Sequence, residues 1–71
     1  MTVRVDKWLW HARFFKTRAL AQSAACSGHI RLNGFRVEKA HHAIKPADVL
    51  TVARGREVLV VRVLGEAAKR G

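Results

Sequence analysis

Three consecutive residues, Lys16, Thr17 and Arg18, combine two cations with a residue type that caps helices. A helix that begins at Thr17 leaves its first backbone N–H groups without partners inside the helix, and its dipole places partial positive charge at the same end. Two flanking cations would make this end a binding site for an anion such as phosphate. In the alternative interpretation, Thr17 is an ordinary N-cap and the two cations are solvated surface charge.

The elements on either side of this tripeptide must position it. Asp6 is predicted to cap a short amphipathic helix over residues 6–14, and Phe14 and Phe15 are predicted to close the corner against the core. A second helix is predicted from Thr17 to just before Gly28. The predicted inward faces are Val5, Trp8, Leu9 and Ala12 in the first helix and Leu20, Ala21, Ala24 and Ala25 in the second.

The apolar period changes to two after Gly28, which predicts strands. Asn33-Gly34 between residues 29–32 and 35–38 is typical of a hairpin with a type I′ turn, because both central positions need positive φ. Residues 39–48 are predicted to be a loop, and a second hairpin is predicted from strands 49–53 and 57–64, with Leu32 and Val60 facing inward. The fold class is therefore α+β, with two short N-terminal helices packed on a small, mostly antiparallel sheet of about four strands.

The charge balance indicates a polyanionic partner. The chain has 71 residues with 14 Lys and Arg against 5 Asp and Glu, a formal net charge of +9. Residues 1–39 carry eight cations and two acids (+6), and residues 40–71 carry six and three (+3). Nucleic acid is the favoured partner. An anionic membrane is disfavoured, because the apolar residues that a membrane-surface helix exposes are needed here for the core.

The length fits one domain over residues 1–64, with a frayed basic tail over residues 65–71. The single cysteine, Cys26, allows no intramolecular disulfide, and cations interrupt every apolar stretch that could span a membrane or form a signal peptide. We therefore expect a cytoplasmic protein.

Catalytic and metal-binding patterns are missing from the sequence. The acids are scattered, no phosphate-binding loop with its lysine occurs, and His41-His42 lacks a metal-ligand spacing to Cys26 or His29. We expect no catalysis, no metal and no cofactor.

The stretch from Arg4 onward reads R-V-D-K-W-L-W-H-A-R-F-F-K-T-R-A-L-A-Q, with S-G-H-I-R-L-N-G following up to Gly34. It resembles the RNA-binding domain named after ribosomal protein S4, and within that superfamily the bacterial fifteen-kilodalton heat-shock protein family of ribosome quality control. The chain departs from the family at Ala24 and Ala25, where larger aliphatic residues are usual. The longer basic extension of those heat-shock proteins does not follow Gly71.

This resemblance implies binding to structured ribosomal RNA or transfer RNA, on large ribosomal subunits that still hold a nascent chain on transfer RNA, in the rescue of stalled translation. We expect a monomer with no membrane partner. The implied RNA-binding residues are Arg4, Lys7, Trp8, Arg13, Lys16, Thr17, Arg18, Gln22, Arg31, Asn33, Gly34 and Arg36. Two alternatives are a domain or partner of an RNA-modifying enzyme, such as a pseudouridine synthase or a transfer-RNA ligase, and a DNA-binding winged helix.

Some of these residues also have a purely structural interpretation. Trp8 could stack on a base, but its spacing with Val5 and Leu9 favours the core, and Trp10 is the better stacking candidate. Turn geometry alone is enough to explain Asn33 and Gly34.

Overall fold

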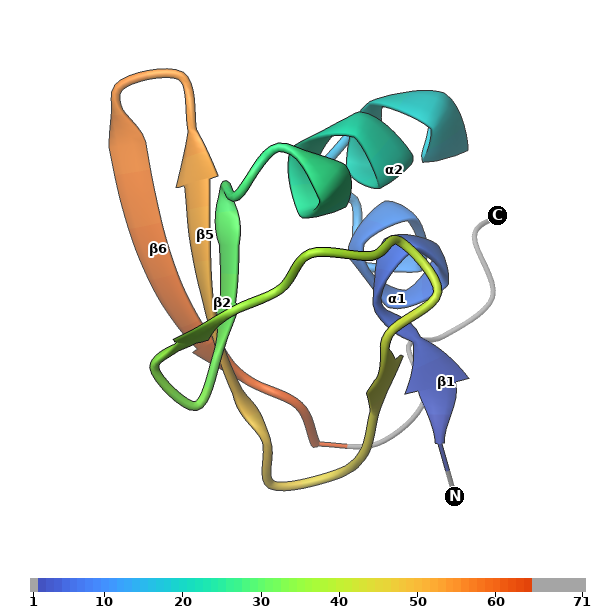
Figure 1. Ribbon diagram of the computed structural model, residues 1–71, viewed down its shortest axis with the longest axis vertical. Helices are drawn as coiled ribbons and strands as arrows, with labels where there is room; N and C mark the ends of the chain where they lie inside the picture. The colour runs from blue at the N-terminus through green and yellow to red at the C-terminus, as the bar shows by residue number, and fades with distance from the viewer. Residues whose placement is uncertain (1, 65–71) are drawn as a thin grey trace.

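The computed structural model describes residues 2–64 and confirms the α+β class (Figure 1). The prediction of a frayed tail over residues 65–71 lies outside this range. The elements follow the chain in the order β1 (Val3–Arg4), α1 (Val5–His11), α2 (Arg18–Cys26), β2 (Ile30–Leu32), β3 (Phe35–Arg36), β4 (Ala43–Ile44), β5 (Val49–Arg54) and β6 (Glu57–Arg62).

The larger sheet has the strand order β3-β2-β5-β6, all antiparallel, and both helices lie on one side of it (Figure 1). Both predicted hairpins are confirmed. Asn33 has φ 51° and Gly34 has φ 88°, the two positive values that a type I′ turn requires.

A second, two-stranded sheet was not predicted. β1 pairs with β4 through Val3 opposite Ile44 and Arg4 opposite Ala43, so the prediction of a loop over residues 39–48 is wrong at β4. Strands of two residues are too short to show an alternating pattern, and their pairing depends on contacts far apart in the sequence. The backbone N–H of Val5 also donates to the carbonyl of His42 at 2.8 Å, which fixes the start of α1.

The prediction for α1 is wrong at both ends. Arg4 is the N-cap and makes no side-chain cap, while Asp6 lies inside the first turn and is buried. The helix stops at His11 because Arg13 adopts φ 67°, in the left-handed region. The Arg13 N–H donates to the Trp10 carbonyl at 3.0 Å, and the Phe14 N–H donates to the Leu9 carbonyl at 3.0 Å. These are the two hydrogen bonds of a Schellman motif. Glycine usually takes this position, so the sequence gives no stop signal there.

The predicted limits of α2 are confirmed. Thr17 caps the helix, its Oγ1 accepting from the Leu20 N–H at 3.1 Å. Gly28 follows the helix with φ 81°. Ala21, Ala24 and Ala25 are buried as predicted, but Leu20 is 51% exposed, so its assignment to the inward face is wrong. The helix meets the core through its narrow alanine stripe, which leaves the larger Leu20 at the flank.

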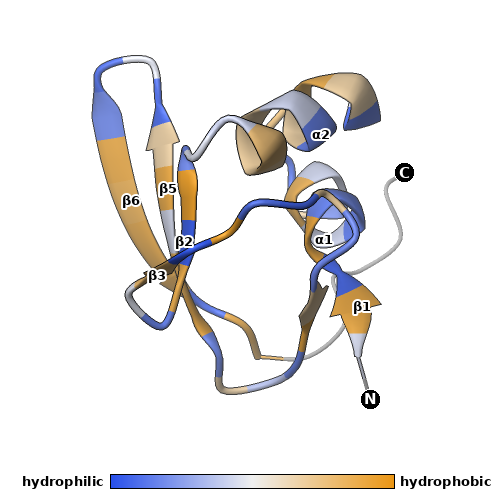
Figure 2. Cartoon of the chain, viewed as in Figure 1, coloured by the Kyte–Doolittle hydropathy of each residue, from blue (hydrophilic) through white to orange (hydrophobic). Residues whose placement is uncertain are grey.

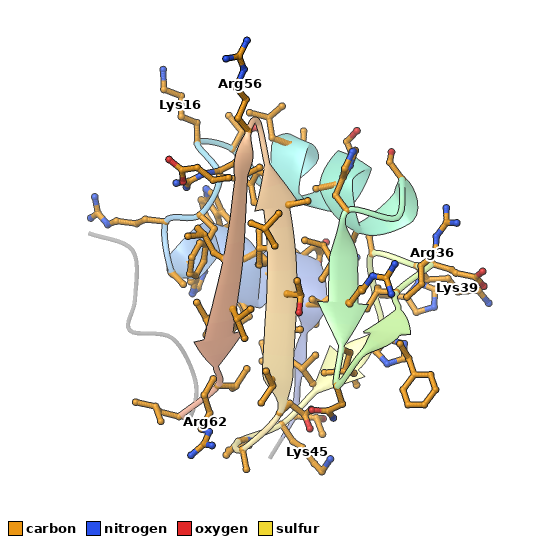
Figure 3. All side chains as sticks on the ribbon, turned by 90° about the vertical axis from the view of Figure 1, so that its left-hand side faces the viewer. Lys16, Arg36, Lys39, Lys45, Arg56 and Arg62 are labelled. Carbon is orange, nitrogen blue, oxygen red and sulfur yellow. The ribbon has the colours of Figure 1, made fainter. Side chains whose placement is uncertain are left out.

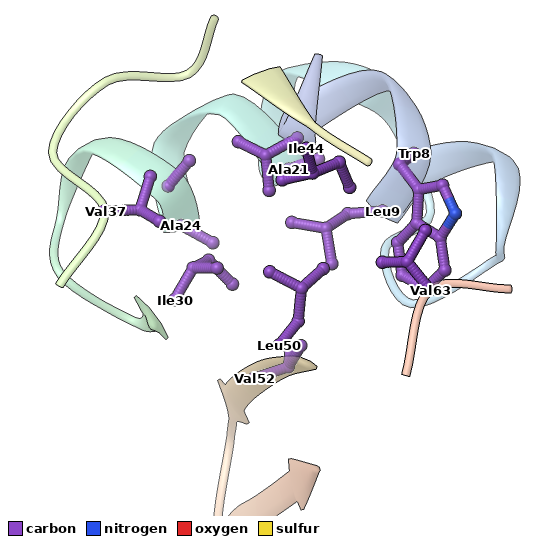
Figure 4. Packing of buried hydrophobic residues seen from close by; sticks show 12 residues of the cluster. Trp8, Leu9, Ala21, Ala24, Ile30, Val37, Ile44, Leu50, Val52 and Val63 are labelled. Atoms are coloured by element: carbon purple, nitrogen blue, oxygen red, sulfur yellow. The ribbon is translucent and has the colours of Figure 1, made fainter. Parts of the chain in front are cut away.

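The core lies between the helices and the inward face of the larger sheet, and β4 and Val63 complete it (Figure 4). Its buried hydrophobic side chains are Val5, Trp8, Leu9, Ala21, Ala24, Ala25, Ile30, Val37, Ile44, Leu50, Val52 and Val63. Leu32 packs partly buried against this cluster, which confirms its predicted direction.

The prediction for Val60 is wrong, since its side chain is 68% exposed and the inward residues of β6 are Leu59 and Val61. Figure 2 shows why the sequence misleads: β6 is hydrophobic along most of its length, so both faces look alike. None of the helices within residues 2–64 is long and apolar enough to cross a membrane.

Candidate nucleic-acid interface

A buried carboxylate organises the corner between α1 and α2. Asp6 has no exposed surface, and its two oxygens accept hydrogen bonds from Arg4, from Nε at 3.1 Å and from Nη2 at 3.0 Å. Arg18 Nε lies 3.5 Å from Oδ2 of the same carboxylate. Two of the cations predicted to bind RNA are therefore held together by an acid that the sequence had suggested was a helix cap.

Asp6 is ionised at neutral pH. Burial by itself raises the pKa of Asp6, but hydrogen bonds from Arg4, from the Lys7 backbone N–H and from Gln22 outweigh it and hold the pKa below the usual aspartate value. The side chains of Arg4 and Arg18 remain 46% and 38% exposed. Each guanidinium is thus oriented by Asp6 and still reaches solvent, where it could meet a phosphate.

The turn between β5 and β6 extends this corner. Arg54 crosses to the α1–α2 loop and donates from Nη1 to the Phe14 carbonyl at 2.8 Å, and its Nη2 is 3.2 Å from Glu57 Oε2. Figure 3 places Lys16 and Arg56 at the same end of the larger sheet. Sequence reasoning missed Arg54 and Arg56, because the only available signal was their charge, and the contact with Phe14 spans 40 residues.

A second basic region lies on the outward face of the β2–β3 hairpin. Arg31 and Arg36 are both exposed and stand directly opposite each other in the strand pairing. Like charges in this position repel. Within residues 2–64 neither arginine has an acidic partner closer than 4.0 Å. The Arg36 guanidinium lies against Gly28, where an added Cβ would come within 2.6 Å of Nε. This pair therefore presents two positive charges to solvent with no acid beside them among the described residues.

Asn33 and Gly34 have structural roles. Asn33 Nδ2 donates to Asp48 Oδ1 at 3.2 Å, and Asn33 Oδ1 accepts from the Val49 N–H at 2.9 Å, so the turn is tied to the start of β5. The hydrogen bond from the Lys45 backbone N–H, supported by those of Asn33 and the Lys45 side chain, holds the pKa of the buried Asp48 below its usual value against the effect of burial.

The two tryptophans also differ. Trp8 is 7% exposed and its ring stacks on that of Phe14, with centroids 5.8 Å apart. The core interpretation of Trp8 is confirmed, and its indole is not accessible for stacking on a base. Trp10 is half-buried beside His11, with ring centroids 4.9 Å apart, so only part of it could meet RNA.

The remaining candidates are on the surface. Lys7, Arg13, Lys16, Thr17 and Gln22 are exposed. The structure brings Arg4, Arg18 and Gln22 together around Asp6 and pairs Arg31 with Arg36, but it does not gather all the candidates into one patch. Figure 3 shows Arg36 and Lys39 at one side of the sheet and Lys45 and Arg62 at the end opposite Lys16 and Arg56.

The chain is similar in sequence and fold to several known proteins. Residues 3–50 match the family model of the S4 domain. The chain is 41% identical to a heat shock protein 15 homolog of Aeromonas salmonicida over 68 residues. The matched stretch covers 96% of this chain and 51% of that protein. The chain thus spans about half the length of the first curated relatives that it matches.

Two further relatives are covered over more of their length. The RQC P-site tRNA stabilizing factor of Bacillus subtilis is 41% identical over 61 residues, 86% of this chain and 70% of that protein. A solved structure described as trimeric, that of Vibrio cholerae heat shock protein 15, is similar with a TM-score of 0.89 and 32% identity, over 100% of this chain and 71% of that chain.

Proposed function

Because the chain belongs to the S4 domain family, we propose that it is a non-catalytic RNA-binding module that recognises structured ribosomal or transfer RNA. One observation carries the proposal: the buried Asp6 carboxylate orients Arg4 and Arg18 beside the capped start of α2. A surface prepared in this way suits RNA helices, which are recognised largely by shape and by their phosphates and ribose hydroxyls.

The two basic regions would bind different parts of the RNA backbone. Arginine can hold a phosphate with two parallel hydrogen bonds, while lysine acts as a point charge. Arg4, Arg18 and Lys16 would hold phosphates at the corner, with Arg54 and Arg56 widening that surface. Arg31 and Arg36 would meet a second stretch of backbone, which would relieve the repulsion between them.

The partner is proposed from the relatives. One is named as a stabilising factor for P-site tRNA, and others as heat shock protein 15. We infer that this chain acts as a cytoplasmic monomer on large ribosomal subunits that carry a nascent chain on transfer RNA. The trimer reported for the Vibrio cholerae protein makes sedimentation of this chain, alone and with RNA, the direct check of the monomer.

A binding titration tests the function. Affinity for a ribosomal RNA hairpin or a transfer RNA, measured by fluorescence anisotropy, should fall steeply with salt, because about five phosphate contacts release their counterions. A flat dependence between low and physiological salt would remove the electrostatic basis of the proposal.

Two double variants with the same change of charge localise the site. The double variant Lys16→Ala with Arg56→Ala should weaken RNA binding by about 1–3 kcal/mol, because each of its two substitutions removes a positive charge near the corner. Lys45→Ala with Arg62→Ala removes the same charge at the opposite end and should lose much less (Figure 3). Equal losses would mean that the chain is a diffuse polycation without a site.

A further inference from the structure

A groove of about 240 Å³ lies between the exposed side of α2 and the β5–β6 turn. Phe15 and Leu20 supply its apolar walls, and Ser23, His29, Arg54 and Gly55 supply polar atoms around it. Leu20 is not held there by the core, since 51% of its surface is exposed. A hollow with apolar walls and a few polar groups around it is the usual form of a site for a small ligand.

The groove adjoins the proposed RNA site. Phe15 directly precedes Lys16, and the Leu20 N–H is the one capped by Thr17. Arg54 is fixed by its bonds to Phe14 and Glu57, so its planar guanidinium is already oriented at the groove. A phosphate held at the corner would therefore place its neighbouring nucleotide close to these walls.

We propose that this groove receives one unpaired nucleobase of the bound RNA, an inference that rests on the proposed function. Protein recognition of RNA often uses bases that have left their stack and lie on aromatic side chains or arginine planes. Phe15 and Leu20 would contact the flat face of the base. The Ser23 hydroxyl and the His29 imidazole could donate to or accept from its edge.

Size and charge favour a base over other occupants. The volume is below the 300–1,000 Å³ typical of pockets for drug-sized ligands, so it suits a single ring system. A helix from a protein partner would need a longer groove with several anchors. The rim is cationic, since Arg54 lines the groove and Arg56 follows Gly55, and the acid Glu57 is paired with Arg54.

Two hairpin RNAs with the same stem test the proposal, one fully paired and the other with a single bulged 2-aminopurine. The unaltered protein should bind the bulged RNA about fivefold to a hundredfold more tightly, from the usual value of one base stacked on a protein. The 2-aminopurine fluorescence should change on binding, because the base exchanges its RNA neighbours for Phe15.

A groove-filling variant supplies the matched comparison. Ser23→Leu places a larger side chain in the groove from an exposed position of α2, and should abolish both the preference for the bulge and the fluorescence change. Cys26→Leu makes a similar change at an exposed α2 position that does not line the groove, and should keep both. Leu20→Ala removes one apolar wall of the groove and should weaken the preference for the bulged RNA. This variant tests the groove if Ser23→Leu does not fold.

The outcomes separate this inference from the function on which it rests. If the unaltered protein binds both hairpins equally, or Ser23→Leu weakens binding to both equally, the groove is not a base site, although RNA binding stands. If neither hairpin binds at low salt, the proposed function itself fails. If Ser23→Leu abolishes self-association in sedimentation and leaves the preference for the bulge intact, the occupant is a second copy and the proposal is overturned.

Discussion

Each helix is followed by a residue in the left-handed backbone region, but one of these residues is a charged arginine and the other is a glycine. Arg13 follows α1 with φ 67°, at the proposed RNA corner, and Gly28 follows α2 with φ 81°, beneath the hairpin arginine Arg36. A side chain at a left-handed position costs free energy that glycine avoids. Arg13 places a cation at the corner despite this cost. Gly28 has no side chain, which leaves room for the Arg36 guanidinium against its backbone.

The cations of the two regions are also held differently. Arg4 and Arg18 are joined to the buried Asp6, so their orientation is part of the folded core. Arg31 and Arg36 face each other on an open strand pair. We therefore expect that removing charge at the corner lowers the stability of the fold, whereas removing charge at the hairpin leaves it nearly unchanged.

Asp6→Ala should have the largest effect. It removes the acid from beneath Arg4 and Arg18 and should cost about 2–3 kcal/mol of unfolding free energy, less than a fully buried pair because both guanidiniums reach water. Chemical denaturation measures it. Glu57→Ala, which breaks the exposed pair with Arg54, is the control and should cost less than about 1 kcal/mol. Similar losses in the two variants would show that Asp6 has no special role.

Acid should reproduce this loss in the unaltered protein. The pKa values of Asp6 and Asp48 are lowered in the folded state, so their contribution is complete above the unfolded value of about 4 and is lost as the pH falls through the folded values. Thermal midpoints should therefore fall below about pH 4. In Asp6→Asn this fall should be smaller; an unchanged profile would mean that Asp6 does not titrate as described.

Gly28→Ala should destabilise the fold by about 1–2 kcal/mol, since alanine is strained at φ 81° and its Cβ would displace the Arg36 guanidinium. Thermal unfolding measures the loss of stability, and RNA titration measures how the displacement of Arg36 changes binding. Gly34→Ala is the control for strain alone, because a Cβ there meets nothing within 4 Å. If both variants bind RNA equally well, the position of Arg36 on Gly28 is irrelevant to binding.

Arg13→Gly should act in the opposite direction on stability. Removing the side chain at φ 67° should stabilise the protein by about 0.5–1 kcal/mol, while the loss of an exposed cation should weaken RNA binding. Parallel denaturation and anisotropy measurements test the pair of effects. A decrease in both stability and affinity would contradict the idea that this cation is kept at a structural cost.

The smallest change in stability is expected for Arg31→Ala. Relief of the repulsion with Arg36 should leave the unfolding free energy unchanged or raise it by a few tenths of a kcal/mol, while RNA affinity falls. Arg18→Ala is the contrasting variant, because it should lower both quantities. Should Arg31→Ala destabilise the protein as much as Arg18→Ala does, the contrast between the two regions is lost.

Local chemistry made several features predictable from the sequence. The type I′ turn at Asn33-Gly34, the cap at Thr17 and the helix end at Gly28 depend on what a few neighbouring residues allow the backbone to do, and all three are confirmed. The strand pairs that follow, the buried alanines of α2 and the cationic corner were also predicted from short patterns. The RNA-binding roles of the named residues stay predictions.

Other features depend on how distant parts of the chain pack together. Asp6 looked like a cap, but it holds Arg4, two residues away, and Arg18, which only the packing of α1 on α2 brings to it. Val60 and Leu20 were wrongly assigned to inward faces, because an apolar side chain does not by itself indicate which face of a strand or helix packs against the core. The link from Arg54 to Phe14, the β1–β4 pair and the groove beside Phe15 join distant parts of the chain, and no local pattern encodes such contacts.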